Sequence, residues 1–375
     1  MRVVDATRLL PGGFATMLLS DLGADVIKIE QPGLGDYMRA TPPTRDGVSP
    51  ANEMVNRNKR SIGIDLKTDE GLQILRTLIK RSDVFIEGFR PGALGKLGLS
   101  FDDVRRWSPR IIYCSISAFG QTLDLSAIPG HDVNFQALAG ALEYPKRAAL
   151  PQLQLSDLVA GTYAALAIVA AYSQRRRAVF IDVPITQSLL SWMVIPISAY
   201  LATGVSPHEG DGLLFGSTPY YNLYETSDSR YIAVAAIEEE FWHNLVVALG
   251  VGQIESKRFG TEEDRRQVAA TLRDVFLTKT MNEWGKILLP NETCATPVLS
   301  VGEAIRSDWA RKSKMLVQSK GNGFVLNSPL TGVPSPRRPR DSKAPSLGEN
   351  TRTILKSLGF PSERVAKLKK RGVVQ

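Results

Sequence analysis

Two acidic residues and one histidine have the types and the spacing that proton-transfer chemistry requires. His131 is one of only three histidines in 375 residues, and it stands between Gly130 and Asp132. Asp157 stands alone at the head of a long run of small and apolar residues. An imidazole and a carboxylate on opposite sides of a bound substrate could remove a proton from one face of a carbon and return it to the other. An isolated aspartate at a helix start could instead act as a covalent nucleophile.

Each of these residues also has an ordinary structural explanation. A lone histidine in a loop is usually a half-buried polar residue with satisfied hydrogen bonds. Asp132 could cap a helix that begins near Val133, and Asp157 could cap the helix that follows it. Glu238, in a run of glutamates, would ordinarily be a helix-start acid that interacts favourably with the helix dipole. Residue type and spacing alone therefore leave both catalysis and capping open.

The elements that must position these residues alternate between strands and helices. Runs rich in β-branched and apolar residues predict strands at 3–5, 24–30, 61–66, 83–87 and 111–116. Helical spacing over 14–22 ends at Gly23, and Thr68 is the predicted N-cap of a helix that ends near Arg81. The intervening residues 10–13 predict a turn without the glycine spacing of a dinucleotide fingerprint. This alternation is typical of an α/β fold with a mostly parallel sheet.

The second half of the chain predicts a smaller α+β domain. A segment rich in Gly, Pro and Ser over 201–219 predicts a linker, and the small domain is expected to cover 220–324. The proline-rich segment 329–345 is too long for a tight turn, so the chain is expected to return to the first domain. The large domain is therefore predicted to comprise residues 1–200 and 325–375.

The composition limits the class of protein. A hydrophobic content of 43% is normal for a soluble globular protein, and the chain is too long for one ordinary core. The chain does not open with a signal-peptide pattern. Its longest apolar candidate, 158–172, falls short of the ~20 residues that span a bilayer, so no membrane partner is expected. Cys114 and Cys294 lack metal-ligand spacing, which predicts no metal site and a reducing, cytoplasmic compartment.

The net charge of +8 suits an anionic partner. The basic residues fall in short, scattered groups without interleaved aromatics, so no nucleic-acid partner is expected. A compact polyphosphate ligand needs only a few such groups. Arg90 and Lys96 follow a predicted strand, and Arg39 and Lys67 lie in other predicted loops. Each alone is most often a solvated charge, but together they favour phosphate binding as strongly as surface placement.

Short motifs over nearly the whole chain form one ordered set. They are Leu10–Gly12, Leu22–Glu30, Asn58–Ile62, Phe89–Gly92, Pro129–Asp132, Ala295–Leu299 and Leu347–Thr351. In this order they resemble the family III CoA-transferases, which include formyl-CoA and carnitine CoA-transferases and the α-methylacyl-CoA racemases. The resemblance implies a Rossmann-like large domain, a smaller α+β domain and an interlocked homodimer. It also implies a CoA thioester as substrate and no permanently bound cofactor.

The resemblance assigns roles by position. The residues implied to contact CoA are Arg39, Ile64, Lys67, Phe89, Arg90, Lys96 and Phe135. In the transferases, the aspartate matching Asp157 is a nucleophile that takes the acyl group and then forms an aspartyl-CoA thioester. In the racemases, that aspartate and the histidine matching His131 are the two acid/base groups. A glutamate matching Glu238 supports this histidine, and Asp132 is its neighbour in the motif.

The presence of both His131 and Glu238 favours the racemases, because transferases commonly have Tyr or Phe at the first position and usually lack the second acid. Removal of an α-proton from a thioester requires a base on each face, which a histidine and a carboxylate supply. The segments Leu158–Gly161 and Leu214–Pro219 depart from the racemase pattern. We therefore predict a 2-methylacyl-CoA racemase, with CoA transfer between carboxylic acids as the alternative. A non-catalytic acyl-CoA-binding protein is the third hypothesis.

Overall fold

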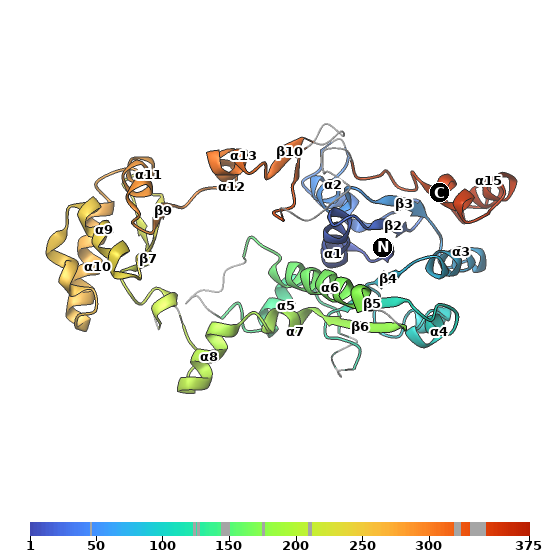
Figure 1. The fold of residues 1–375 in the computed structure, drawn as a ribbon, viewed down its shortest axis with the longest axis horizontal. Coiled ribbons are helices and arrows are strands. Elements are labelled where there is room, and N and C mark those ends of the chain that lie inside the picture. Colours follow the sequence, from blue (N-terminus) through green and yellow to red (C-terminus); the bar gives the residue numbers. More distant parts are fainter. Residues whose placement is uncertain are drawn as a thin grey trace. The chain divides into compact units, whose positions relative to one another are not determined.

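The computed structural model describes residues 1–45, 47–122, 125, 128–143, 151–174, 177–208, 212–318, 324–330 and 343–375. The described chain divides into two compact units, drawn in Figure 1. The large unit joins residues up to Gly140, the stretch that ends at Trp192, and Asp308–Gln375. The small unit is built on Met193–Ser307.

A six-stranded sheet forms the centre of the large unit, with the order β3-β2-β1-β4-β5-β6. Its strands are β1 (Arg2–Ala6), β2 (Asp25–Glu30), β3 (Arg60–Gly63), β4 (Val84–Glu87), β5 (Ile112–Ser117) and β6 (Val179–Pro184). Every neighbouring pair is parallel, so the α/β prediction is confirmed. The strand order reverses between β1 and β4. In such sheets, ligands bind in the crevice beyond the carboxyl ends of the strands at this switch point.

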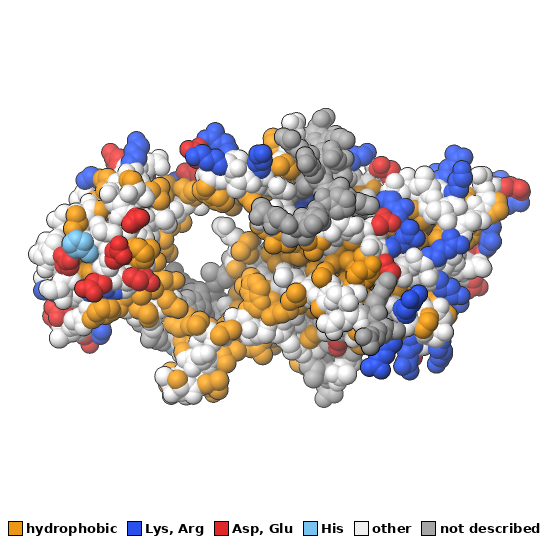
Figure 2. Space-filling model, viewed as in Figure 1, with side chains coloured by type: hydrophobic (Ala, Val, Ile, Leu, Met, Phe, Trp, Pro, Cys, Tyr) orange, Lys and Arg blue, Asp and Glu red, His pale blue; other side chains and the backbone are white. Residues whose placement is uncertain are grey.

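Helices cover both faces of this sheet, and most of its strand residues are therefore buried. The helices of the large unit are α1 (Leu9–Asp21), α2 (Pro50–Asn56), α3 (Asp69–Lys80), α4 (Phe101–Trp107), α5 (Asp132–Leu138), α6 (Leu155–Gln174), α7 (Ile185–Leu190), α13 (Asp308–Lys312), α14 (Thr351–Ser357) and α15 (Ser362–Lys370). Val3 and its neighbours pack with α1 and α6, whereas Val4 packs with α3, α4, α14 and α15. Figure 2 shows Lys and Arg side chains gathered over the end of the unit that carries α3, α4 and α15.

The C-terminal segment completes the β3 edge of the sheet. The backbone N–H of Asn350 donates to the carbonyl of Ser61 at 2.9 Å, and that of Gln375 donates to the carbonyl of Gly63 at 3.2 Å. A short hairpin, β10 (Leu316–Gln318) with β11 (Phe324–Leu326), also belongs to the large unit. Residues 331–342 of the expected proline-rich crossing lie outside the described residues.

The predicted N-cap Thr68 and the predicted helix end at Gly23 are confirmed, whereas the predicted turn over 10–13 is wrong. The Thr68 side chain accepts the Gly71 N–H at 3.1 Å at the start of α3, and Gly23, with φ of +95°, follows the end of α1. The predicted turn over 10–13 is instead the first part of α1, which begins at Leu9. Pro11 is tolerated there because first-turn N–H groups lack helical partners.

Helix α6 packs closely against α1. A Cβ added at Gly161 would lie 2.6 Å from the carbonyl oxygen of Pro11, so only glycine permits this approach. Among the described residues, α6 is the helix that is long and apolar enough to cross a membrane, by length and composition alone. The expectation that no apolar segment reaches that length is therefore wrong, because the helix extends beyond 158–172. Its buried stripe, which includes Ala160 and Ala164, accounts for part of this apolar composition.

The small unit contains a three-stranded antiparallel sheet in the order β7-β8-β9. Its elements are α8 (Val194–Thr203), β7 (Tyr221–Glu225), β8 (Tyr231–Ala235), α9 (Glu239–Leu249), α10 (Glu262–Phe276), α11 (Met281–Leu288), β9 (Ala295–Pro297) and α12 (Val301–Arg306). Its core includes a group of aromatic side chains: Tyr224 stacks on Phe276 with ring centres 5.1 Å apart, and the Trp284 indole donates to the Phe276 carbonyl at 2.9 Å. This unit gives the protein its separate α+β part.

The compact units divide the chain at somewhat different residues from the predicted domain limits. The predicted limits stay predictions. Helix α8 belongs to the small unit, although most of it falls within the predicted large domain 1–200. Residues 308–318 belong to the large unit, although they fall within the predicted small domain. Residues 209–211 of the expected linker lie outside the part of the chain that the structure describes.

Candidate active site

A cavity of about 310 Å³, here called cavity A, lies beyond the carboxyl ends of β1, β4 and β5. Its walls include Thr7–Leu9 after β1, Gly88–Pro91 after β4, and Ile116–Ala118 at the end of β5. The loop before α5 contributes Pro129–His131, and α6 contributes Asp157. Parallel strands end at the same edge of the sheet, which brings these segments together although they are distant in sequence.

Asp157 and His131 both line cavity A. His131 is exposed at the start of α5, whereas Asp157 is half-buried in the first turn of α6. Burial, and next the negative charge of Asp132, raise the pKa of the Asp157 carboxyl to about 7. A carboxyl group that titrates near neutral pH can both accept and donate a proton during turnover. The structure therefore brings the two predicted acid/base residues to one cavity.

Asp132 connects the two helices that carry these residues. Its Oδ1 atom accepts the backbone N–H groups of Ser156 at 2.8 Å and Asp157 at 3.2 Å. Its Oδ2 atom accepts the Gln136 side-chain N–H at 2.6 Å. The first-turn amides of a helix lack partners within that helix, so Asp132 caps α6 from α5. Asp132 is thus a helix cap, but it caps α6 and not the helix that begins near Val133. Asp157 lies in the first turn of α6 and is not its cap.

The Gly130–His131–Asp132 motif has a steric explanation as well. A Cβ added at Gly130 would lie 2.6 Å from the Phe135 ring, so a larger residue would displace that ring. Phe135 is buried edge-to-face against Phe119, with ring centres 5.9 Å apart, and it lines cavity A. The backbone N–H of His131 donates to the Asn134 side chain at 3.0 Å, which begins α5 at this point.

A second cavity of about 210 Å³, cavity B, lies beside the first at the ends of β1 and β2. Three of the predicted CoA contacts line it: Ile64, Lys67 and Phe89. Phe89 also lines cavity A, as do Arg90 and Phe135. Most of the predicted CoA contacts therefore surround two adjoining cavities in the large unit.

Arg39 and Lys96 line neither cavity. The Arg39 guanidinium donates to both carboxylate oxygens of Glu30 at 2.7 Å. Although burial opposes ionisation, these bonds and the arginine charge hold the pKa of Glu30 below its usual value. Glu30 itself lines cavity B, so Arg39 lies behind the wall rather than in it. Lys96 is exposed, next to Leu97, which lines cavity B.

Glu238 belongs to the small unit. It is exposed at the N-cap of α9, with φ of −73° and ψ of 150°. This position is that of a helix-start acid, as its sequence context indicates. Its support of His131 stays a prediction.

Three further residues at or next to these cavities are Thr7, Arg8 and Glu87, which the sequence motifs do not single out. Thr7 and Arg8 follow β1 directly and line both cavities. Glu87 ends β4 and accepts the backbone N–H of Phe89 at 2.7 Å, so it holds one of the residues that both cavities share. Burial raises the pKa of Glu87 to about 7. Their position at or directly after the carboxyl end of a predicted strand is the sequence signal that could have identified them.

The protein has an α/β fold whose cavities lie at the switch point of a doubly wound parallel sheet, the place where such folds bind ligands. The family model described as CoA-transferase family III matches residues 1–351, and the chain belongs to this family. The resemblance seen in the sequence motifs is thereby confirmed.

Similar proteins of this family have two kinds of activity. The chain is 31% identical to an α-methylacyl-CoA racemase from Homo sapiens, over 100% of the chain and 96% of that relative. It is 30% identical to a succinyl-CoA:glutarate CoA-transferase from Mus musculus, over 100% of the chain and 89% of that relative. A crystal structure of a CAIB/BAIF family protein from Brucella suis is similar with a TM-score of 0.85 and 27% identity, covering 96% of this chain and 98% of that one. The protein is therefore an enzyme of this family, and its relatives divide between racemases and CoA-transferases.

Proposed function

We propose that the protein is a 2-methylacyl-CoA racemase that removes and returns the α-proton of a CoA thioester. The observation that carries this proposal is that His131 and Asp157 line the same cavity of about 310 Å³. The pKa of Asp157 near 7 suits a group that must exist in both protonation states at neutral pH.

The proposed reaction uses one group on each face of the α-carbon. The deprotonated group takes the α-proton, and the electron pair of the C–H bond delocalises onto the thioester oxygen as an enolate. The protonated group then returns a proton to the opposite face, which inverts the configuration. Each group ends in the state in which the other began, so the next turnover can run in the reverse direction. Asp132 has a positioning role, since it holds the first turn of α6.

The two cavities support a placement for the CoA thioester. In this proposal, cavity B takes the nucleotide end beside Ile64 and Lys67, and cavity A takes the thioester beside Phe135 and Arg90. Phe89 contacts the segment between them, because it lines both cavities. Arg39 acts indirectly by holding Glu30, and Lys96 meets a phosphate from the rim beside Leu97.

Deuterium exchange tests the racemase proposal without a guess about a second substrate. The α-proton of (R)- or (S)-2-methylacyl-CoA should exchange with solvent deuterium when the enzyme is added without an acceptor acid. For the epimer whose α-proton faces His131, His131→Ala should slow this exchange at least about a hundredfold, the usual contribution of a general acid or base. His243→Ala is the matched control, because His243 is exposed in the small unit and bonded to Glu255. No exchange across several acyl chain lengths would sink the proposal, and CoA binding with no turnover would favour a binding protein.

CoA transfer is the alternative, and one observation favours it. Among the described residues, none donates a hydrogen bond to the Asp157 carboxylate, which leaves its oxygens available as a nucleophile. In this reaction the carboxylate attacks the thioester, expels CoA as a thiolate and forms a mixed anhydride. The thiolate then attacks the aspartyl carbonyl, which releases the first acid and forms aspartyl-CoA for a second acid to attack.

Trapping separates this alternative from the racemase. Hydroxylamine should convert an acyl adduct at Asp157 to a hydroxamate that mass spectrometry detects, and His131→Ala should keep substantial transfer activity. A racemase should form no adduct.

We also propose a homodimer. Helix α8 is apolar but has no buried residue within its own chain, and its Leu201 side chain is 77% exposed. Apolar surfaces of this kind mark contacts with other molecules. The α6 and α7 region of the large unit adds exposed Leu166 and Trp192. A second copy of the chain is the partner that the family resemblance implies.

A further inference from the structure

Arg8 is a cation that both cavities share. It follows β1 at the carboxyl edge of the sheet, and the residues common to the two cavities are Thr7, Arg8 and Phe89. Its guanidinium donates to the Tyr37 hydroxyl at 3.3 Å and lies 5.3 Å from the centre of that ring. These contacts orient the side chain but leave most of its five N–H donors available.

The guanidinium of Arg8 has no acidic partner among the described residues. Other arginines of the large unit do: the pairs are Arg2 and Arg60 with Asp25, Arg39 with Glu30, and Arg57 with Asp21. Arg90, which also lines cavity A, is unpaired among the described residues as well. Asp157 is the acid among the residues that line this cavity, so its wall carries more positive than negative groups. Such a wall suits an anionic ligand.

Hydrogen bonds to buried charged side chains hold the turn that carries Arg8. Asp5 accepts the backbone N–H of Thr7 at 3.0 Å and its hydroxyl at 2.6 Å. The Lys28 ammonium donates to the Thr7 carbonyl at 2.7 Å, and Asp36 accepts the backbone N–H of Leu9 at 3.0 Å. Leu9 has φ of +61°, a left-handed conformation that is unfavourable for a residue other than glycine. The bonds on both sides of Arg8 hold this turn in place.

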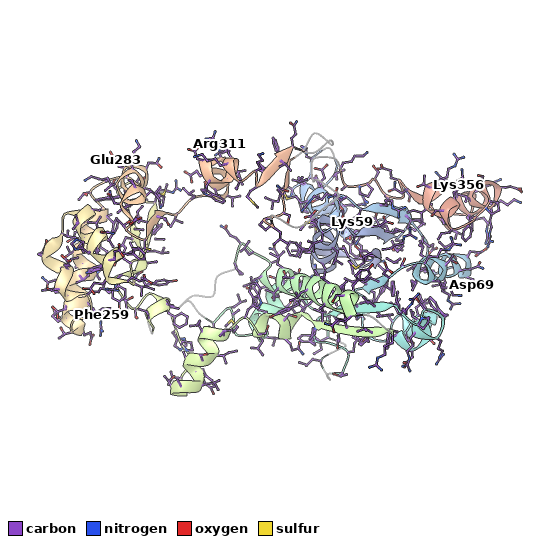
Figure 3. All side chains as sticks on the ribbon, in the orientation of Figure 1. Lys59, Asp69, Phe259, Glu283, Arg311 and Lys356 are labelled. Atoms are coloured by element: carbon purple, nitrogen blue, oxygen red, sulfur yellow. The ribbon has the colours of Figure 1, made fainter. Side chains whose placement is uncertain are left out.

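These charged side chains form one buried chain of ion pairs. The Lys28 ammonium lies 2.8 Å from Asp36 and 3.6 Å from Asp5, and the Lys59 ammonium lies 3.4 Å from Asp5. Lys59 (Figure 3) also donates to Thr16 at 2.7 Å. All of the charged members are almost free of solvent contact. Buried ion pairs are poor sources of stability compared with apolar packing, so stability alone does not explain these linked ion pairs. Positioning of the turn that carries Arg8 is an alternative explanation.

We propose that Arg8 binds an anionic oxygen group of the substrate, and that the buried chain Lys59–Asp5–Lys28–Asp36 positions it for this task. The inference rests on the proposed function, in which a CoA thioester occupies the two cavities. Such a substrate offers anionic oxygens from two sources: the phosphates of CoA, and a carboxylate on the acyl group where one is present. A guanidinium binds either group through paired N–H···O bonds.

Calorimetric titration of the full chain distinguishes the two sources. The probes are CoA, propionyl-CoA, succinyl-CoA and propionyl-pantetheine, which has no phosphate. The proteins are wild type, Arg8→Gln, Arg8→Lys and Arg110→Gln, a control at an exposed arginine that lines neither cavity. If the phosphates are the partner, Arg8→Gln weakens all the CoA compounds about ten- to a hundredfold and leaves the pantetheine thioester unchanged. If the acyl carboxylate is the partner, only succinyl-CoA is weakened.

The conservative variant and the control sharpen this test. Arg8→Lys should restore only part of the affinity that Arg8→Gln loses, because the charge remains but the paired N–H···O bonds of the guanidinium are lost. Arg110→Gln should bind as wild type does. Equal affinity of wild type and Arg8→Gln for every probe overturns the inference while the proposed function stands. If wild type binds none of the CoA compounds, the proposed function fails and the inference falls with it.

The positioning role of the buried chain has its own readout. Lys28→Met removes the bond to the Thr7 carbonyl, so it should weaken CoA binding in the wild-type background. In the Arg8→Gln background the same change should cause no further loss, because Lys28 acts through Arg8. Equal losses in both backgrounds would show that Lys28 only supports the fold. Asp36→Asn replaces Lys28→Met in this cycle if the latter does not fold.

Discussion

At the scale of single residues, the raised pKa of Asp157 makes the stability of the protein depend on pH. Burial, and next the charge of Asp132, raise the pKa of its carboxyl from 3.8 to about 7. A group whose pKa is raised by folding stabilises the fold below its unfolded pKa and loses that contribution as the pH rises through the folded pKa. Asp157 should therefore lower the free energy of unfolding progressively as the pH rises from about 4 to about 7.

Asp157→Asn should remove this pH dependence. The amide is uncharged in both states, so the variant should match wild type near pH 4 and exceed its free energy of unfolding at pH 8. The expected gain is about 1–2 kcal/mol, which allows for the partial exposure of the side chain. Urea unfolding at several pH values measures it. A difference between the two proteins that does not change with pH would contradict the assigned pKa shift.

Asp132 has two effects that substitution can separate. Asp132→Asn keeps an oxygen for the amides of Ser156 and Asp157 but loses the negative charge, so the pKa of Asp157 should fall. The corresponding limb of the pH–rate profile should move to lower pH. Asp132→Ala also removes the cap, which should cost about 1 kcal/mol of stability. If Asp132→Asn left the pH–rate profile unchanged, Asp132 would be a cap alone.

At the scale of elements, the contact between α1 and α6 holds Asp157 in the wall of cavity A. Gly161→Ala should destabilise the protein by about 1–3 kcal/mol, because its Cβ would meet the Pro11 carbonyl at 2.6 Å and the helices would have to separate. Pro11 also lines cavity A, so activity should fall as well. Thr162→Ala, on the exposed side of the same helix, is the control and should change stability little. Equal melting temperatures of the two variants would refute this close approach.

At the scale of the whole molecule, the proposed homodimer depends on covering the apolar surface of α8. Leu201→Glu should shift the protein toward monomers, because it places a charge on a side chain that is 77% exposed within its own chain. Sedimentation velocity over a range of concentrations measures the shift. Val247→Glu is the matched control, since Val247 is 61% exposed on α9 of the small unit. A wild-type protein that stays monomeric at all concentrations would end this proposal.

Much of the fold was predictable because its signals are local. The strands of the parallel sheet are short apolar runs, and the Thr68 cap depends on residues within one turn. The start of α1 was predicted wrongly because Pro11, Gly12 and Gly13 have turn propensities, whereas packing against Thr7 and α6 makes them helical. Tertiary contacts therefore override propensity where small residues allow a close approach.

The sequence by itself determined the family, and it indicated His131 and Asp157 as candidate site residues, because ordered motifs and residue types are read along the chain. Only the tertiary structure decided that Asp132 caps a helix about 25 residues later and that Arg39 is committed to Glu30. It also brought Arg8 to the junction of the two cavities. The physical reason is that hydrogen bonds and ion pairs between distant segments depend on how strands and helices pack, and the order of residues in one segment does not encode its neighbours in space.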